Sequence, residues 1–166
     1  MRWLAIVLSV LVAGGCGGAK KSAAPKFSNC VAASGPYSIC GRGPKGGSGP
    51  SRIVRAGAVV AGPIEKVGRW LGLYVSPDGK TLLAQWSGAC EISTAYFVSA
   101  AGGKPRPLTN YAKGSAESGA YGWRGSRALV SLPRGEWPNR KAGTYLVDPR
   151  TMDKQLVRAR HTQPGC

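Results

Sequence analysis

The sequence has few acidic residues and a single histidine. Seven Asp and Glu residues stand against 23 Lys and Arg residues, so that the formal net charge is +16. The histidine, His161, lies in the basic stretch "RARHTQPGC", where we expect a solvated side chain rather than a general base. The motifs G-x-S-x-G, H-E-x-x-H and G-x-x-x-x-G-K-S/T are all absent. The sequence therefore offers no recognisable catalytic centre, and we expect the protein not to be an enzyme.

A long hydrophobic run is also lacking. The uncharged run at residues 4–13 is shorter than the roughly 20 residues that a membrane-spanning helix needs. With Arg2 before it and the small residues "AGGC" at its end, the run is typical of a secretory signal. The cysteine after small residues resembles the bacterial lipobox, although Ala13 stands where that family more often has Leu. We expect a signal peptide at 1–15 and a lipid on Cys16; the alternative is ordinary signal cleavage and a soluble product.

The five cysteines contain no C-x-x-C pair, and with a single histidine this argues against a metal site or a bound cofactor. If Cys16 carries lipid, four cysteines remain, enough for two disulfides in an oxidising compartment. Four cysteines allow three pairings. We favour Cys30–Cys40, which closes a short loop, together with Cys90–Cys166.

The positive charge is spread along the sequence rather than concentrated in one motif. A small group at Lys20, Lys21 and Lys26 follows Cys16, and near an anionic membrane each lysine could add roughly 1 kcal/mol of attraction. Scattered charge of this kind is typical of a soluble β-rich surface. A surface for anionic envelope polymers is the alternative, and nucleic acid is not expected as a partner.

The amino-acid composition and the pattern of apolar residues divide the chain into two parts. Residues 16–51 are rich in Gly, Ala, Ser, Pro and Lys, which predicts a flexible tether after the lipidated cysteine. Residues 52–166 hold short β-branched and aromatic runs without helical periodicity, which predicts an all-β domain. Within it, Pro and Gly of "SPDGK" (76–80) predict a hairpin turn, and "AGG" (101–103) predicts a second one.

An internal repeat appears in the β-domain. Residues 96–108 align without gaps over 145–157, and residues 78–83 align over 125–130. The spacing is close to the 40–50 residues of a propeller blade. The pattern "SPDGKTLLAQW…YFVSAAGGKPRPLT" resembles a blade of the TolB-like, WD-related propellers of bacterial envelope proteins. The resemblance implies a binding or scaffolding surface.

The length of the β-domain limits how many such repeats it holds. Repeats at about 70–109 and 121–157 leave room for only one further hairpin among the 115 residues from 52 to 166. A closed ring needs at least four blades. We therefore expect two antiparallel blade-like sheets plus an extra hairpin, as a partial propeller or a sandwich-like domain.

One polar loop is a candidate ligand surface. Trp137 lies in "RGEWPNRK" with Arg134, Arg140 and Lys141 around it, a combination suited to an anionic or carbohydrate ligand. The alternative is a tryptophan that covers the end of a sheet.

Together these features predict a lipid-anchored, non-enzymatic binding or scaffolding module on the extracytoplasmic face of the cell membrane. One alternative is an envelope hydrolase or ligand-processing enzyme, which would need Glu91, His161 and a serine brought together. The other is binding of anionic envelope polymers through the basic surface.

The anchor can be tested by the intact mass of the protein purified from its native membrane fraction, with and without reduction. We expect a chain that begins at Cys16 and carries acyl chains, and that gains about four hydrogens on reduction of two disulfides. A mass without lipid, beginning elsewhere in the chain, would contradict the anchor.

Overall fold

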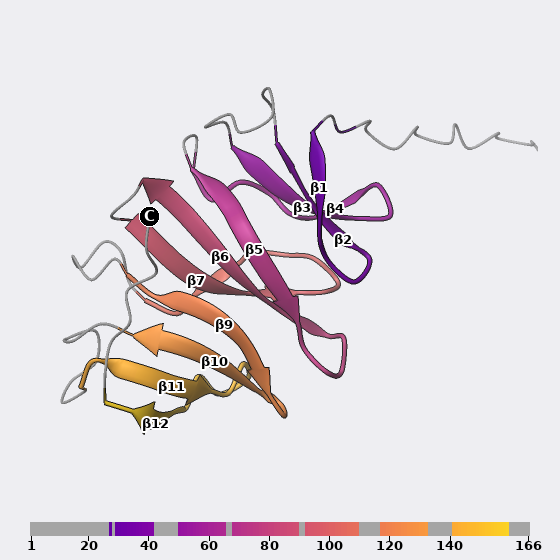
Figure 1. Cartoon of the computed structure of the whole chain (residues 1–166). Coiled ribbons are helices and arrows are strands. Elements are labelled where there is room, and N and C mark those ends of the chain that lie inside the picture. The colour runs from indigo at the N-terminus through magenta and orange to yellow at the C-terminus, as the bar shows by residue number, and fades with distance from the viewer. Residues whose placement is uncertain are drawn as a thin grey trace, which may run out of the picture.

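The chain folds into three four-stranded antiparallel sheets that stack on one another (Figure 1). The computed structural model describes residues 27, 29–41, 50–65, 68–89, 92–109, 117–132 and 141–159. The strands are β1 (Cys30–Ser34), β2 (Tyr37–Gly41), β3 (Ser51–Arg55), β4 (Ala58–Ala61), β5 (Arg69–Val75), β6 (Thr81–Ala89), β7 (Ile92–Ser99), β8 (Arg106–Pro107), β9 (Gly119–Arg124), β10 (Arg127–Leu132), β11 (Gly143–Val147) and β12 (Lys154–Arg158).

Each sheet is a meander in which strands consecutive in the sequence pair with one another. The N-terminal sheet is β1-β2-β3-β4, the central sheet is β5-β6-β7-β8 and the C-terminal sheet is β9-β10-β11-β12. None of the three is closed into a barrel, and the described residues contain no helix. The expected all-β class is therefore confirmed. Among the described residues, accordingly, no helix has the length and hydrophobicity of a membrane span.

The two repeated segments correspond to whole sheets. The repeat at 70–109 coincides with β5–β8, and the repeat at 121–157 coincides with β9–β12. In the predicted turn of the central sheet, Gly79 N donates to Ser76 O at 2.9 Å, and Gly79 adopts a φ of 68° that favours glycine. The aligned fragments occupy equivalent places, because 78–83 and 125–130 each join the first strand of a sheet to its second.

The structure differs from the sequence-based expectation at the N-terminal side of the domain. The expected extra hairpin is present as β3 and β4, but β1 and β2 complete it to a third four-stranded sheet. Residues 29–41 therefore belong to the folded domain and not to the tether expected over 16–51. Their strand character is hard to see in the sequence because β1, "CVAAS", consists of small residues and is almost wholly exposed.

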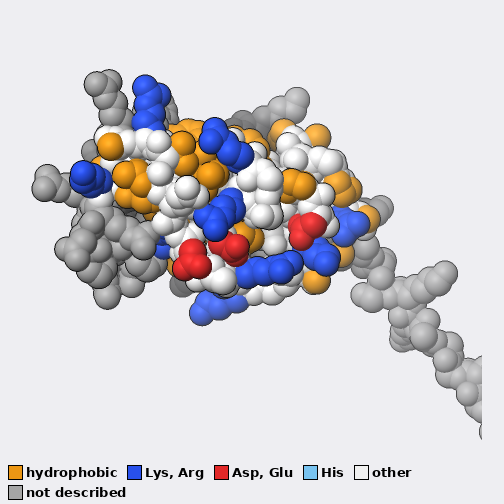
Figure 2. Space-filling model, turned by 90° about the horizontal axis from the view of Figure 1, so that it is seen from below, with side chains coloured by type: hydrophobic (Ala, Val, Ile, Leu, Met, Phe, Trp, Pro, Cys, Tyr) orange, Lys and Arg blue, Asp and Glu red, His pale blue; other side chains and the backbone are white. Residues whose placement is uncertain are grey.

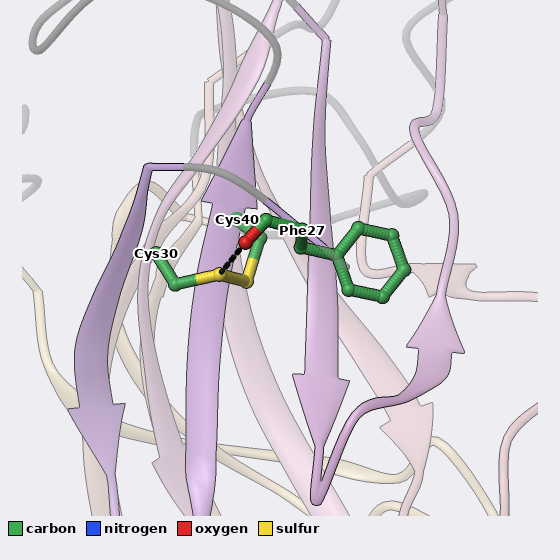
Figure 3. Close-up of a disulfide and its surroundings, with 3 residues drawn as sticks. All are labelled: Phe27, Cys30 and Cys40. Atoms are coloured by element: carbon green, nitrogen blue, oxygen red, sulfur yellow. Dashed lines mark hydrogen bonds between the residues drawn. A yellow bond between two sulfur atoms is a disulfide. The ribbon is translucent and has the colours of Figure 1, made fainter. Parts of the chain in front are cut away.

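The expected Cys30–Cys40 disulfide is confirmed (Figure 3). The two cysteines lie directly opposite each other on β1 and β2. Cys30 Sγ also lies 3.7 Å from the carbonyl oxygen of Phe27; a disulfide sulfur has no proton to donate, so this is a van der Waals contact. In the chain-entropy view, closing a loop of this length stabilises the fold by about 3 kcal/mol. Cys16, Cys90 and Cys166 lie outside the described residues.

The central sheet is buried on both faces, and strand β6 shows how. Leu82, Ala84 and Trp86 pack against the N-terminal sheet, whereas Leu83 and Gln85 point toward the C-terminal sheet. This follows from the alternation of side chains along a strand. It also accounts for the nearly continuous apolar run "TLLAQW", since a strand covered on both sides needs apolar residues at every position.

Two hydrophobic cores result. The core between the N-terminal and central sheets consists of Tyr37, Ile53, Val60, Ala61, Trp70, Leu73, Leu82, Ala84, Trp86, Tyr96 and Val98. The core between the central and C-terminal sheets consists of Leu83, Ala95, Phe97, Leu108, Ala128, Val130, Leu132, Tyr145 and Val147.

A polar network fastens the C-terminal sheet to the central one. The amide of Gln85 donates to the carbonyl of Ser118 at 3.0 Å and to the hydroxyl of Ser93 at 2.5 Å, and its oxygen accepts from Ala120 N at 2.7 Å. The buried hydroxyl of Ser118 in turn accepts from Ala95 N at 2.8 Å. These bonds hold the start of β9 against β6 and β7, and so set where the C-terminal sheet begins.

We predict that Gln85→Ala lowers the free energy of unfolding by about 2 kcal/mol, since it removes hydrogen bonds that cross between sheets and leaves backbone groups without partners. Urea denaturation measures this loss. Gln155→Ala, on the exposed edge strand β12, is the matched control and should stay within about 0.5 kcal/mol of the parent. Equal effects of the two substitutions would show that the Gln85 network does not fasten the sheets.

Candidate functional site

An open cleft lies where turns of the central and C-terminal sheets meet. In a meander, the turn from the first strand to the second and the turn from the third to the fourth lie at the same end of the sheet. Residues 76–81 of the central sheet therefore meet residues 123–126 and 148–150 of the C-terminal sheet. Together they enclose a cleft of about 480 Å³.

The first polar group of the cleft is Asp78, held in place by its own turn. One carboxylate oxygen, Oδ1, accepts hydrogen bonds from the Ser76 hydroxyl at 2.6 Å and from Lys80 N at 3.0 Å. These two bonds, the Ser76 bond first, lower the pKa of Asp78 below its ordinary value, and the positive charges of Lys80 and Arg150 add to the effect. The hairpin turn predicted at 76–80 is therefore present, and these bonds hold it.

Asp148 has the same arrangement in the turn from β11 to β12. Its Oδ1 accepts from Arg150 N at 2.7 Å and from Thr151 N at 3.2 Å. These backbone bonds lower the pKa of Asp148, with further help from the charges of Arg127 and Arg150. Arg150 thus lowers the pKa of both carboxyl groups, so its positive charge acts on both turns.

The wall of the cleft is fixed by contacts between the two sheets. Trp123 Nε1 donates to the carbonyl of Tyr74 at 3.0 Å, and the Trp123 ring centroid lies 6.1 Å from that of Phe97. The guanidinium of Arg106, on β8, donates to the carbonyl of Pro149. A side chain of each sheet therefore bonds to the backbone of the other, which holds the turns at a constant separation.

The cleft presents two ionised carboxylates whose turns use only one oxygen. Among the described residues, no hydrogen bond is assigned to Oδ2 of Asp78 or of Asp148, so each can accept a hydrogen bond from a ligand. Lys80 and Arg150 line the same cleft. Figure 2 likewise shows acidic side chains next to Lys and Arg on one side of the molecule. The cleft is suited to a ligand with hydroxyl or ammonium donors.

Of the residues of the predicted ligand surface, the structure describes Lys141. Lys141 is exposed and precedes β11, whereas the cleft is at the other end of that strand. Its carbonyl accepts a hydrogen bond from the Tyr145 hydroxyl. Arg134, Trp137 and Arg140 lie outside the described residues.

Glu91 and His161, which the enzyme alternative requires, are also outside the described residues. Within the part of the chain that the structure describes, no group of three or more His, Cys, Asp or Glu side chains is arranged to hold a metal ion. The sequence signal for the cleft was the hairpin turn predicted at 76–80. It contained no sign that this turn meets residues 148–150 of the C-terminal sheet.

Comparison of the chain with protein-family models, with curated proteins and with solved structures found no match.

We predict that Ser76→Ala raises the pKa of Asp78 toward its ordinary value of 3.8, because the substitution removes the strongest bond to the ionised carboxylate. A carboxyl-carbon NMR titration measures this. Ser126→Ala, which also lines the cleft, is the control and should leave the Asp78 titration unchanged.

The same substitution has a consequence for acid stability. Since the pKa of Asp78 is lowered on folding, its ionised form stabilises the fold above the unfolded-state pKa. That stabilisation is lost as the pH falls through the folded-state pKa. In Ser76→Ala the free energy of unfolding should therefore fall less between the unfolded-state pKa and the folded-state pKa of Asp78. An unchanged dependence of the unfolding free energy on pH would contradict the assignment of the Ser76 bond as the main cause of the lowered pKa.

Proposed function

We propose that this protein is a lipid-anchored, non-enzymatic binding module on the extracytoplasmic face of the cell membrane. Its cleft binds a small polar ligand whose hydroxyl or ammonium groups donate to Asp78 and Asp148. The observation that carries the proposal is the pair of carboxylates, each held by its own turn with one oxygen left for a ligand.

Preorganisation supports binding at this cleft. A side chain that is already held by two hydrogen bonds loses little further freedom when a ligand arrives, which lowers the entropic cost of association. The separation between the turns is likewise set in advance by the Trp123–Tyr74 and Arg106–Pro149 bonds. The indole ring of Trp123 and the rings of Pro77 and Pro149 supply apolar surface beside the two carboxylates.

The direction of the pKa shifts supports binding rather than acid–base catalysis. A carboxyl group that acts as a general acid near neutral pH needs a raised pKa. The pKa values of Asp78 and Asp148 are lowered instead, so both groups are ionised and can only accept hydrogen bonds.

The N-terminal sequence supports the location. The signal-like residues 1–15 precede Cys16, and the first described residue, Phe27, follows Cys16 by eleven positions. Fully extended, this length of chain spans at most about 40 Å. A lipid on Cys16 would therefore keep the domain, and its cleft, at the membrane surface.

The binding proposal is tested by ligand-observed NMR with two sets of probes, neutral mono- and disaccharides and small primary amines. We expect at least one set to bind, and Asp148→Asn to weaken that binding about tenfold or more, because a charged acceptor is replaced. Asp78→Asn should have a similar effect.

The matched control is Glu117→Gln, which makes the same carboxylate-to-amide change just before β9, at the end of the strand away from the cleft. It should bind like the parent. Absence of binding by both probe sets, or equal binding by all variants, would overturn the cleft as the ligand site.

A further inference from the structure

The cleft between the two turns carries both signs of charge in equal number. Asp78 and Asp148 are its two acidic side chains, and Lys80 and Arg150 are its two basic ones. The other residues that line it are uncharged. The charges of the lining therefore sum to zero, although the net charge of the whole chain is +16. A ligand in this cleft meets two anionic and two cationic groups at once.

The two basic side chains of the cleft are exposed and keep their donors for a ligand. Within the described part of the chain, no hydrogen bond or ion pair is assigned to the ammonium group of Lys80 or to the guanidinium of Arg150. Two other arginines near the cleft differ in this respect. Arg106 donates to a backbone carbonyl of the cleft, and Arg127 donates to Gln155 Oε1 at 3.3 Å. Lys80 and Arg150 are thus the cations that a ligand can engage.

Each basic side chain belongs to the same turn as one of the carboxylates. Lys80 N donates to Asp78 Oδ1 at 3.0 Å, and Arg150 N donates to Asp148 Oδ1 at 2.7 Å. The charge of Arg150 also lowers the pKa of both carboxyl groups. The groups of opposite sign consequently lie near enough to one another for one small molecule to contact both.

The apolar part of the cleft is suited to the carbon atoms of such a molecule. Trp123 is half-buried, its Nε1 donates to Tyr74 O, and its ring lies beside that of Phe97. Since the polar atom of the indole is already bonded, the surface that it offers to the cleft is carbon. The volume of about 480 Å³ lies within the usual range for small-molecule pockets.

The mixture of charges selects the chemical class of the ligand. A simple amine is attracted by the two carboxylates but repelled by Lys80 and Arg150, and a simple anion meets the reverse. A molecule that bears both an ammonium group and an anionic oxygen group satisfies both pairs, and its net charge of zero matches that of the lining. Groups of like charge placed against the wrong ligand provide discrimination, because bringing like charges together is costly.

We propose that the ligand of the cleft is a zwitterion, a small molecule or head group with one ammonium group and one anionic oxygen group. The ammonium donates to Oδ2 of Asp78 and of Asp148, and the anionic group accepts from Lys80 and Arg150. This inference rests on the proposed function and names the chemical class of its ligand. Free amino acids have this chemistry. The head group of an ethanolamine phospholipid has it too, with a phosphate in place of the carboxylate.

The first experiment compares probes of similar size by NMR titration of the full chain carrying Cys16→Ser, which removes the lipid. The zwitterions are glycine, β-alanine and γ-aminobutyrate, which differ in the spacing of their charges. Propylamine has only the ammonium group, and propionate has only the carboxylate. We expect the best of the zwitterions to bind about tenfold or more tightly than either singly charged probe, because it engages both pairs of side chains.

Arg150→Gln gives the sharper result, because it should change two affinities in opposite directions. It should weaken binding of the zwitterion about tenfold or more, since a charged donor is lost. It should strengthen binding of propylamine, since a group of like charge is removed. The turn is retained, because the backbone N of residue 150 still donates to Asp148. Lys80→Gln should act in the same way, and it replaces Arg150→Gln if that variant does not fold, as judged by circular dichroism.

The matched control is Arg158→Gln, which makes the same change at an exposed position. Arg158 lies opposite Thr144, at the end of β12 away from the cleft. This variant should bind all probes like the parent.

The failures of the two proposals are distinguishable. If propylamine binds as tightly as every zwitterion, or if Arg150→Gln changes both affinities in the same direction, the zwitterion is overturned and the cleft remains a binding site for amines. If no zwitterion, amine or saccharide binds, both the zwitterion and the proposed function are overturned.

A vesicle assay identifies the source of the zwitterion. The Cys16→Ser chain is sedimented with vesicles of phosphatidylcholine alone or mixed with phosphatidylethanolamine. The choline head group has the same charges but no N–H to donate to a carboxylate, so it serves as the control. Binding that requires phosphatidylethanolamine and is lost in Arg150→Gln supports a lipid head group as the ligand. Binding of free zwitterions without vesicle binding supports a soluble ligand. Equal binding to both kinds of vesicle, with no free zwitterion bound, overturns the proposal.

Discussion

Burial of the central sheet on both faces is the constraint on which the rest of the structure depends. Strand β6 sends Leu82 into one core and Leu83 into the other, and both side chains are fully buried. Burying a leucine of this kind contributes about 1.5–3 kcal/mol, and the neighbouring strands add similar amounts. Each outer sheet has one face in a core, so its fold depends on packing against the central sheet.

This stacking also creates the cleft. Neither aspartate turn encloses a cavity by itself, because each is a short connection within one sheet. The cleft forms because the Gln85 network and the Trp123–Tyr74 bond hold the C-terminal sheet at a set position on the central sheet. The carboxylates of Asp78 and Asp148 then line the same hollow. The proposed ligand site is thus a product of sheet packing acting on two locally formed turns.

The order of the sheets explains why the domain is apolar where it is open. Sheets that follow one another with their first strands side by side can continue in the same direction, and nothing within the described residues ends the series. Leu129 and Leu146 pair on the outer face of the C-terminal sheet, and Val59, which is 45% exposed, lies on the outer face of the N-terminal sheet.

Local features were determined by the sequence itself. The turns at Asp78 and Asp148 depend on bonds between residues two or three apart, and the all-β class depends on alternation along short strands. The two internal repeats predicted two of the three sheets. The short loop between Cys30 and Cys40 favoured a disulfide between these two cysteines. Only the tertiary structure decided that β1 and β2 join the domain and that the two turns meet across a cleft. Both depend on contacts between residues far apart in the chain, which leave no periodic or compositional signal in either partner.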